Sequence, residues 1–379
     1  MAWFCWRVRV HLLWLVFLPA LAYQYLAIIS EALYLARRYA KAPASVPPQG
    51  VSVLKPLRGL DPNTYAAFVS QIQQDYPAFE VLFGAASADD PAADEVRRLQ
   101  QEFPDAPVRL IIGGRAAPNA KVGLLQELAS QARYPLLVIN DSDIKVTPGY
   151  LAEVTAPLAE PTIGIVTCPY RVKAHNFPAA WEALGITTDF MPSTLVAQTI
   201  GVREFGFGST LAFRAADLEA IGGFAAVASY LADDYQLAKR ISQLNKRALL
   251  STYVVETSLG DDTWAGGWRH QLRWARTIRF SKGGGYAGLF ITHTGVWILL
   301  ALAMGAWLPA LALASVRILS AFVASSLVIG STQATAFCWL APVWDLYSFA
   351  VWLASYAGNR VRWRDRLLEI DSEGRIKNV

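Results

Sequence analysis

Two aspartates, Asp141 and Asp143, directly follow the apolar run 135–140. Two carboxylates at positions i and i+2, at the tip of a buried strand, can share a hard divalent cation with the phosphates of a substrate. Mg²⁺ or Mn²⁺ suits such oxygen ligands, whereas softer metals do not, because no Cys or His lies near in sequence. The alternative interpretation is a plain acidic turn.

A second acidic pair, Asp89 and Asp90, follows the apolar run 79–87. A carboxylate at this point can accept hydrogen bonds from the base or ribose of a nucleotide. The alternative is structural: Asp90 precedes Pro91 and a helical pattern that starts near Asp94, which is typical of a helix N-cap.

A third pair, Asp233 and Asp234, lies inside the helix-like pattern 230–241. Adjacent acidic residues in a helix usually form part of a solvated face. A buried member of the pair could instead act as a general base near an acceptor hydroxyl.

The motif Gln271-Leu272-Arg273-Trp274 lies in segment 264–282, which contains three tryptophans and five basic residues. This composition predicts an interfacial helix, apolar on one side and basic on the other. In the functional interpretation, Arg273 faces a leaving diphosphate and Trp274 stacks on the acceptor.

The acidic motifs lie in a region, 42–284, that reads as one α/β domain behind a linker at 42–50. Strands alternating with helices predict a mostly parallel sheet, and ligands of such sheets bind beyond the carboxyl ends of the strands. Helical patterns lie between several strands, for example at 94–103 and 121–132. The predicted strands are 50–57, 79–87, 108–114, 135–140, 163–170, 208–214 and 248–257.

Composition indicates a membrane protein. Of 379 residues, 54% are hydrophobic and 17% are charged, which excludes a disordered chain and argues against a wholly soluble one. The net charge of +4 is too small to indicate a nucleic-acid partner. Three widely spaced cysteines exclude a disulfide framework and a CxxC-type zinc site. Nothing in the sequence indicates an oligomeric state.

The apolar residues concentrate at the two ends of the chain. Residues 10–35 predict an N-terminal transmembrane helix, since a span needs about 20 apolar residues. A cleaved signal peptide is the alternative, but this run continues into a helix-like segment. Residues 286–358 predict two or three membrane helices, with spans on either side of Arg317, and 359–379 reads as a basic tail.

Together the motifs resemble those of GT-A glycosyltransferases of the processive-synthase and lipid-glycosylating type. More narrowly, the string is similar to the ceramide glucosyltransferase family, family 21, and within it to the bacterial branch that glycosylates hopanoids. The resemblance covers roughly 50–280 and the N-terminal anchor. It rests on KPLRGLDPN (55–63), DDPA (89–92), PNAK (118–121), DSDI (141–144), GFGSTLAFR (206–214), IGGF (221–224), ADDY (232–235) and QLRW (271–274).

This resemblance implies a Rossmann-like GT-A domain and a role for each motif. Asp90, with Asp89, would contact the uridine of a UDP-sugar, and Lys121 would lie near the nucleotide or its phosphates. Asp141 and Asp143 would bracket the ribose-phosphate and an Mg²⁺ or Mn²⁺ ion. Asp234 would be the general base, with Asp233 as the alternative. Gln271, Arg273 and Trp274 would close over the diphosphate and the acceptor.

The implied reaction is an inverting transfer of glucose or N-acetylglucosamine from a UDP-sugar to a hydroxyl of a membrane lipid, ceramide or a hopanoid polyol. The product would be a β-glycoside. UDP-sugars are cytosolic, so the resemblance places the domain on the cytoplasmic face of a membrane, here a bacterial inner membrane. Two alternatives stay open: a processive polysaccharide synthase, and an inactive nucleotide-binding membrane scaffold.

Overall fold

A computed structural model describes residues 2–40, 48–61, 63–259, 263–363 and 366–377. The chain forms two compact units. The helical unit consists of Met1–Ala40, Ala174–Gly201 and Asp261–Leu367. The α/β unit consists of Lys41–Lys173, Val202–Gly260 and Leu368–Val379.

The α/β unit is built on a seven-stranded sheet with the order β3-β2-β1-β4-β7-β5-β8. All neighbouring pairs are parallel except those of β7, which runs antiparallel to β4 and β5. The mostly parallel sheet is therefore confirmed. The strands are β1 (Val51–Leu57), β2 (Phe79–Ala85), β3 (Val108–Ile112), β4 (Leu136–Ile139), β5 (Ile163–Thr167), β7 (Leu211–Arg214) and β8 (Arg247–Leu250).

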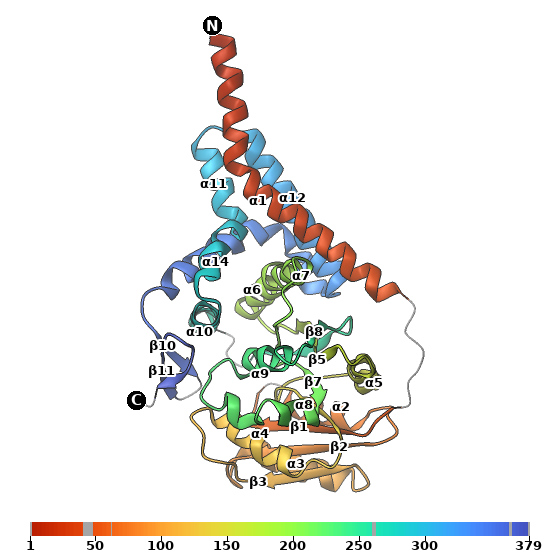
Figure 1. Ribbon diagram of the computed structural model, residues 1–379. Coiled ribbons are helices and arrows are strands. Elements are labelled where there is room, and N and C mark those ends of the chain that lie inside the picture. The colour runs from red at the N-terminus through yellow and green to blue at the C-terminus, as the bar shows by residue number, and fades with distance from the viewer. Residues whose placement is uncertain (1, 41–47, 62, 260–262, 364–365, 378–379) are drawn as a thin grey trace. The chain divides into compact units, whose positions relative to one another are not determined.

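Both faces of the sheet are covered by helices, which can be followed by their labels in Figure 1. A small second sheet pairs β6 (Tyr170–Val172) with β9 (Val255–Thr257), and β11 (Arg366–Ile370) pairs with β12 (Ile376–Lys377). The helices are α2 (Thr64–Ile72), α3 (Pro91–Glu102), α4 (Ala120–Ser130), α5 (Tyr150–Thr155), η1 (Ala156–Ala159), α8 (Ala215–Ala220), η3 (Phe224–Val227) and α9 (Asp233–Ser242).

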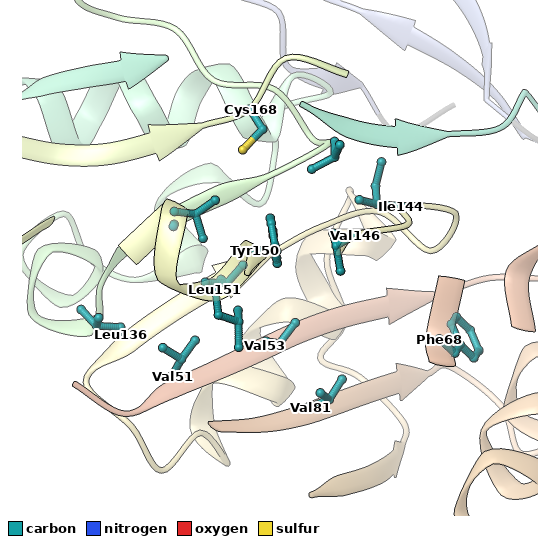
Figure 2. Packing of buried hydrophobic residues seen from close by; sticks show 14 of the residues in the cluster. Val51, Val53, Phe68, Val81, Leu136, Ile144, Val146, Tyr150, Leu151 and Cys168 are labelled. Atoms are coloured by element: carbon teal, nitrogen blue, oxygen red, sulfur yellow. The ribbon is translucent and has the colours of Figure 1, made fainter. Parts of the chain in front are cut away.

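Alternating residues of the strands pack into two separate cores. Val51 and Val53 of β1 belong to the core that α2, α3 and α5 cover, whereas Leu54 belongs to the core under α4 and α9. This follows from the two-residue period of a strand, which sends successive side chains to opposite faces. In Figure 2, Val51, Val53 and Leu136 gather with Leu151 of α5.

Every apolar run predicted as a strand contains one. Two of the runs are longer than a single strand, and each divides at a change of sheet. Within the run 163–170, β5 ends at Thr167 and β6 begins at Tyr170. The run 248–257 contains all of β8 except its first residue, and all of β9. The predicted helices at 94–103 and 121–132 are α3 and α4.

The helical unit gathers three stretches that lie far apart in sequence. α1 continues without a break to Tyr39, as the helix-like segment after the apolar run predicted. The elements are α1 (Ala2–Tyr39), α6 (Phe177–Gly185), η2 (Ile186–Phe190), α7 (Met191–Thr199), α10 (Trp264–Lys282), η4 (Gly283–Thr292), α11 (Thr294–Ala303), α12 (Trp307–Val323), η5 (Ala324–Val328), α13 (Thr332–Ala336), η6 (Cys338–Leu340), α14 (Ala341–Ser355) and β10 (Arg360–Trp363).

Two helices in the described residues are long and apolar enough to cross a membrane, Trp14–Tyr39 and Trp307–Val328. A third span results if the bent pair Trp264–Thr292 and Thr294–Ala303 counts as one. The prediction of spans on either side of Arg317 was wrong, because Arg317 lies inside α12. A single charge within an apolar run does not end a helix when a buried partner accepts it.

That partner is Asp345 of α14, which is likewise a single charged residue within an apolar stretch of the sequence. Arg317 Nη2 lies 2.7 Å from Asp345 Oδ1, and Nε donates to Oδ2 at 2.9 Å. Arg317 Nη1 donates to the carbonyl of Thr188 in η2 at 2.9 Å, and Asp345 Oδ2 accepts from the backbone N–H of Gly295. Both side chains are buried, so the pair ties α12, α14, η2 and α11 together.

Removing one member of this pair should destabilise the helical unit strongly. Arg317→Met leaves the Asp345 carboxylate buried without a cation, which costs about 3–5 kcal/mol, whereas replacing both members with apolar residues is often close to neutral. We expect the thermal midpoint in detergent to fall for Arg317→Met and largely to recover in Arg317→Met/Asp345→Leu. Equal losses in the two variants would contradict this account.

Candidate active site

The candidate site lies at the edge of the sheet where its parallel strands end. β1, β2 and β4 finish at this edge, and antiparallel β7 begins there, with Leu211 paired to Ile139. The strand order changes direction between β1 and β4, since β2 and β3 lie on one side of β1 and β4 on the other. Such a switch point is where open α/β sheets bind ligands.

Asp141 follows β4 and faces Gly208, which precedes β7. The backbone N–H of Asp141 donates to the Gly208 carbonyl at 3.1 Å. Lys121, at the start of α4, donates from Nζ to Asp141 Oδ1 at 2.7 Å. A Cβ at position 208 would lie 2.7 Å from Asp141 Oδ2, so glycine keeps the space in front of this oxygen open.

Asp233 and Asp234 form the first turn of α9 and complete the cluster. Asp233 Oδ2 lies 3.8 Å from the Lys121 ammonium. Asp234 Oδ2 accepts from the backbone N–H of Gly208 at 3.0 Å, and its Oδ1 accepts from that of Tyr235 at 2.8 Å. Lys121 and Gly208 thus bring together acidic motifs that lie about ninety residues apart in sequence, as the spacing of Asp141 and Asp234 shows.

The cluster carries more negative than positive charge, and burial sharpens the imbalance. Burial raises the pKa of Asp234 to about 6, with repulsion from Asp233 adding to the shift and Lys121 opposing it. Burial also raises the pKa of Asp233, and Lys121 again opposes. For Lys121, burial disfavours the charge, but Asp141 and Asp233 outweigh it and raise the pKa of the ammonium. Asp234 is therefore a carboxyl group that titrates near neutrality.

Asp143 is held on the other side of the same turn. Its Oδ2 accepts from the hydroxyl of Thr257 and from the backbone N–H of Ser258. Burial raises the pKa of Asp143, and the charge of Asp141 adds to the effect. Asp143 also lines a small pocket with Lys145 and Lys173. Within the acidic turn, therefore, one carboxylate faces the Lys121 cluster and the other faces the loop after β9.

Asp90 has the structural role that the sequence offered as the alternative. Its Oδ1 accepts from the backbone N–H of Ala92 and caps α3. Both of its oxygens also accept from the backbone N–H of Gly59, at 3.0 and 3.2 Å. Asp90 thereby fixes the loop that follows β1, while its neighbour Asp89 is exposed. The contact of either residue with a nucleotide base stays a prediction.

Two residues that contact the candidate site escaped the sequence reasoning, although both lie in motifs that carried the resemblance. Lys55 is fully buried in β1 and donates to Asn140 Oδ1 at 2.8 Å and to the Asp141 carbonyl at 2.7 Å. Burial lowers the pKa of Lys55 to about 7, with Asp143 and Asp141 opposing the shift. A lysine in a mostly apolar strand was the available signal, since a buried ammonium requires acceptors.

The second of these residues is Asn119, which caps α4 from inside the site. Its Oδ1 accepts from the backbone N–H groups of Lys121 and Val122. Its Nδ2 donates to the Tyr230 carbonyl at 2.9 Å and to Asp233 Oδ1 at 3.3 Å. An asparagine just before a helical pattern is an N-cap signal, but sequence alone does not show that the cap also holds Asp233.

Gln271, Arg273 and Trp274 lie on α10 and belong to the helical unit. Gln271 Nε2 donates to Glu182 Oε1 at 2.8 Å, and His270 pairs with the same carboxylate. The Trp274 ring lies 4.6 Å from that of His270 and 5.8 Å from that of Phe190, between ring centroids. The structure thus brings Lys121, Asp141, Asp233 and Asp234 together in one unit and this motif into the packing of the other.

The acidic turn offers the oxygen ligands that a hard divalent cation prefers. Asp141 and Asp143 supply carboxylate oxygens, and Gly208 leaves Asp141 Oδ2 accessible. Among the described residues, no group of three or more His, Cys, Asp or Glu side chains could hold a metal by itself. An ion here would therefore take its other ligands from phosphate oxygens and water, which is how Mg²⁺ is usually held.

Comparison with known proteins places this architecture. A family model described as glycosyl transferase family 21 matches residues 12–376. Ceramide glucosyltransferase 1 of Caenorhabditis elegans is 32% identical over 207 residues, which cover 54% of this chain and 44% of the relative. Ceramide glucosyltransferase 3 of the same organism is 28% identical over 250 residues, 65% of this chain and 52% of the relative. The chain spans about half the length of these relatives.

A solved structure with the same architecture is that of a mannosyltransferase from Pyrobaculum calidifontis in complex with GDP-Man and Mn²⁺. It aligns with 90% of this chain and 97% of its own at a TM-score of 0.51 and 21% sequence identity. At that identity the likeness shows a shared fold, and the predicted GT-A class is confirmed.

The raised pKa of Asp234 predicts a stability that depends on pH. The folded-state pKa of about 6 exceeds the ordinary value of 3.8, so the folded chain binds an extra proton between these values. The stability due to that proton is lost as pH rises through about 6. From pH 5 to pH 7.5 we expect the parent to lose about 1 kcal/mol more stability than Asp234→Asn, which has no proton to release.

Thermal midpoints in detergent measure this difference, and Asp105→Asn, at an exposed site in the same unit, controls for the loss of one acidic charge. Parallel pH profiles for the parent and Asp234→Asn would contradict the assignment of the shift to Asp234.

Proposed function

The chain belongs to glycosyl transferase family 21, and from that premise we propose that it is an inverting glycosyltransferase acting on a membrane lipid. The donor is a UDP-sugar carrying glucose or N-acetylglucosamine, and the acceptor is a hydroxyl of ceramide or of a hopanoid polyol. The observation that carries the proposal is the cluster of Asp141, Asp233 and Asp234 around Lys121 at the carboxyl edge of the sheet.

The donor binds along this edge. Asp89 and Asp90 contact the uridine, and Lys121 and Asp141 contact the ribose and phosphates. Asp141 and Asp143 hold Mg²⁺ or Mn²⁺. The fold neighbour's complex with GDP-Man and Mn²⁺ supports a nucleotide-sugar and a divalent ion in this fold. When bound, the ion neutralises negative charge on the diphosphate.

Asp234 is the general base. The acceptor oxygen attacks the anomeric carbon from the face opposite the diphosphate, the carbon–oxygen bond to UDP breaks, and Asp234 takes the hydroxyl proton. A single displacement inverts the anomeric centre, so an α-linked donor gives a β-glycoside. A pKa of about 6 suits a base that must be ionised near neutral pH and still accept a proton. Asp233, which faces Lys121, is the alternative base.

The direction of the helices supports a topology with the α/β unit and the C-terminal strand on the same side of the membrane. Phe17 packs with Leu313, Glu31 Oε1 accepts from Ser320, and Arg38 donates to the Val328 carbonyl, so α1 and α12 run in the same direction. Two spans that run the same way need a returning span between them, and the bent pair that ends in α11 supplies it. The C-terminal strand β12 lies in the α/β unit, which agrees with two crossings after that unit.

The proposed side is the cytoplasmic one, where UDP-sugars occur, and Arg37 and Arg38 in the last turn of α1 support it. A bacterial inner membrane is the proposed location. The resemblance to the family assigns Gln271 and Arg273 to the leaving diphosphate and Trp274 to the acceptor.

Transfer should be tested with purified protein, Mg²⁺ or Mn²⁺, UDP-glucose or UDP-N-acetylglucosamine, and ceramide or a hopanoid polyol, with products identified by mass spectrometry. We expect one hexose per lipid. Asp234→Asn should lower the transfer rate by about 10²–10⁴ while UDP-sugar binding persists, because only the base is lost.

If Asp234→Asn is active and Asp233→Asn is inactive, Asp233 is the general base instead of Asp234. A polymeric product would indicate a processive synthase instead. Binding of UDP-sugar without any transfer by the parent would favour the scaffold.

Gly208→Ala should damage the donor site without disturbing the fold. The added Cβ would lie 2.7 Å from Asp141 Oδ2 and 3.4 Å from Lys121 Nζ, so the carboxylate must move. We expect the KM for the UDP-sugar to rise about tenfold, which corresponds to ~1.4 kcal/mol of lost binding. Gly149→Ala is the matched control, since a Cβ there meets nothing within 4 Å. An unchanged KM in Gly208→Ala would show that Asp141 Oδ2 takes no part in binding the donor.

A further inference from the structure

The last strand of the chain pairs with the segment that leads into the candidate base. Ile376 donates its backbone N–H to the Ser229 carbonyl at 2.7 Å, and Leu231 donates to the Gly374 carbonyl at 3.4 Å. Tyr230 and Arg375 form an antiparallel bridge between these contacts. Segment 229–231 thus receives an added strand from residues that follow the entire helical unit in sequence.

Side chains reinforce this pairing. Arg375 Nε donates to the Tyr230 hydroxyl at 3.2 Å, and its guanidinium lies 5.6 Å from the centroid of the Tyr230 ring. On the other edge of β12, Ile376 pairs with Ile370 of β11, and both isoleucines are buried. The Gly374 turn before β12 has φ +82°, a conformation that favours glycine.

Segment 229–231 belongs to no helix or strand of the α/β unit's main sheet. It lies between η3, which ends at Val227, and α9, which begins at Asp233. The N-cap residue of α9 is Ala232, which has no side chain able to cap the helix. The first turn of α9, with Asp233 and Asp234, is therefore held by the contacts of Asp234 with Gly208 and Tyr235 and by those of the preceding segment.

From this segment the contacts lead directly to the site. The Tyr230 carbonyl accepts from Asn119 Nδ2, which also reaches Asp233 Oδ1. Asn119 is fully buried, and its backbone N–H donates to the Ala228 carbonyl. Through the cap of α4, the same residue orients Lys121, which pairs with Asp141. One side of segment 229–231 meets β12 and the other meets the catalytic cluster.

We infer that β12 is a positioning element for catalysis: by adding to segment 229–231, it holds Tyr230 against Asn119 and so places Asp233 and Asp234 beside Lys121. This inference rests on the proposed function for the identity of the base. Loss of the pairing should misplace the base, whereas Asp141 and Lys121, which bind the donor, keep their mutual contact and the Asn119 cap of α4. A misplacement of about 1 Å can lower a catalytic rate about 10²-fold.

Two variants test the inference in the full-length protein. Ile376→Pro removes the N–H that donates to Ser229. Arg375→Ala, at an exposed position, removes the contact with Tyr230 and leaves the backbone pairing in place. We expect kcat to fall at least tenfold in Ile376→Pro and about threefold in Arg375→Ala. A shift of the base by well under 1 Å is enough for losses of kcat of this size. The donor KM should stay within twofold of the parent. Arg375→Lys, which keeps a cation over the ring, should recover part of the loss.

The matched control is Arg98→Ala, which removes another exposed arginine stacked on a tyrosine of the same unit, Tyr65, at 4.1 Å. Its kcat should equal that of the parent. Hydrogen–deuterium exchange supplies the second measurement: amides of 229–236 should exchange faster in Ile376→Pro, and those of β1 should not.

Unchanged exchange at 229–236 would overturn the inference, because β12 would then not order the segment. Faster exchange with an unchanged kcat would overturn it too, since the pairing would then be structural only. A parent that transfers no sugar would refute the proposed function instead, and the exchange measurement alone would then decide whether β12 holds the segment.

Discussion

The Lys121 ammonium is the interaction on which the candidate site depends. It is the cation that Asp141 and Asp233 share, and its charge also opposes the raised pKa of Asp234. Without it, three carboxylates would meet in a partly buried space and would repel one another strongly in the low dielectric. With it, the cluster retains an excess of negative charge, which suits both a divalent ion and a base that titrates near neutrality.

The sheet brings these groups together through one reversed strand. β7 enters antiparallel between β4 and β5, so Gly208 arrives at the edge where β4 ends. The backbone of this residue then joins two acidic motifs, accepting from Asp141 and donating to Asp234. Position 208 has to be small because a Cβ there would lie only 2.7 Å from Asp141 Oδ2. Gly208, which has no side chain, therefore contributes to both the sheet and the site through its backbone.

In the helical unit, away from the site, a buried charge is likewise paired with a group of opposite charge. Arg317 and Asp345 are each out of place in an apolar sequence, yet together they satisfy each other and a carbonyl of η2. The C-terminal residues follow a related logic, since β12 satisfies backbone groups of a segment that forms no regular element of its own. In both cases, groups distant in sequence complete each other's hydrogen bonds.

The sequence by itself determined the elements and the chemistry of the motifs. Apolar runs with turn residues located all seven strands of the sheet, and Asp141, Asp143 and Asp234 stood out because carboxylates at strand and helix ends are short-range signals. Only the tertiary structure decided which groups meet. Lys55, Asn119 and Gly208 owe their roles to contacts across 26 to 114 residues, and Arg317 owes its place inside a span to Asp345. Such pairings depend on strand order and burial, which local patterns do not encode.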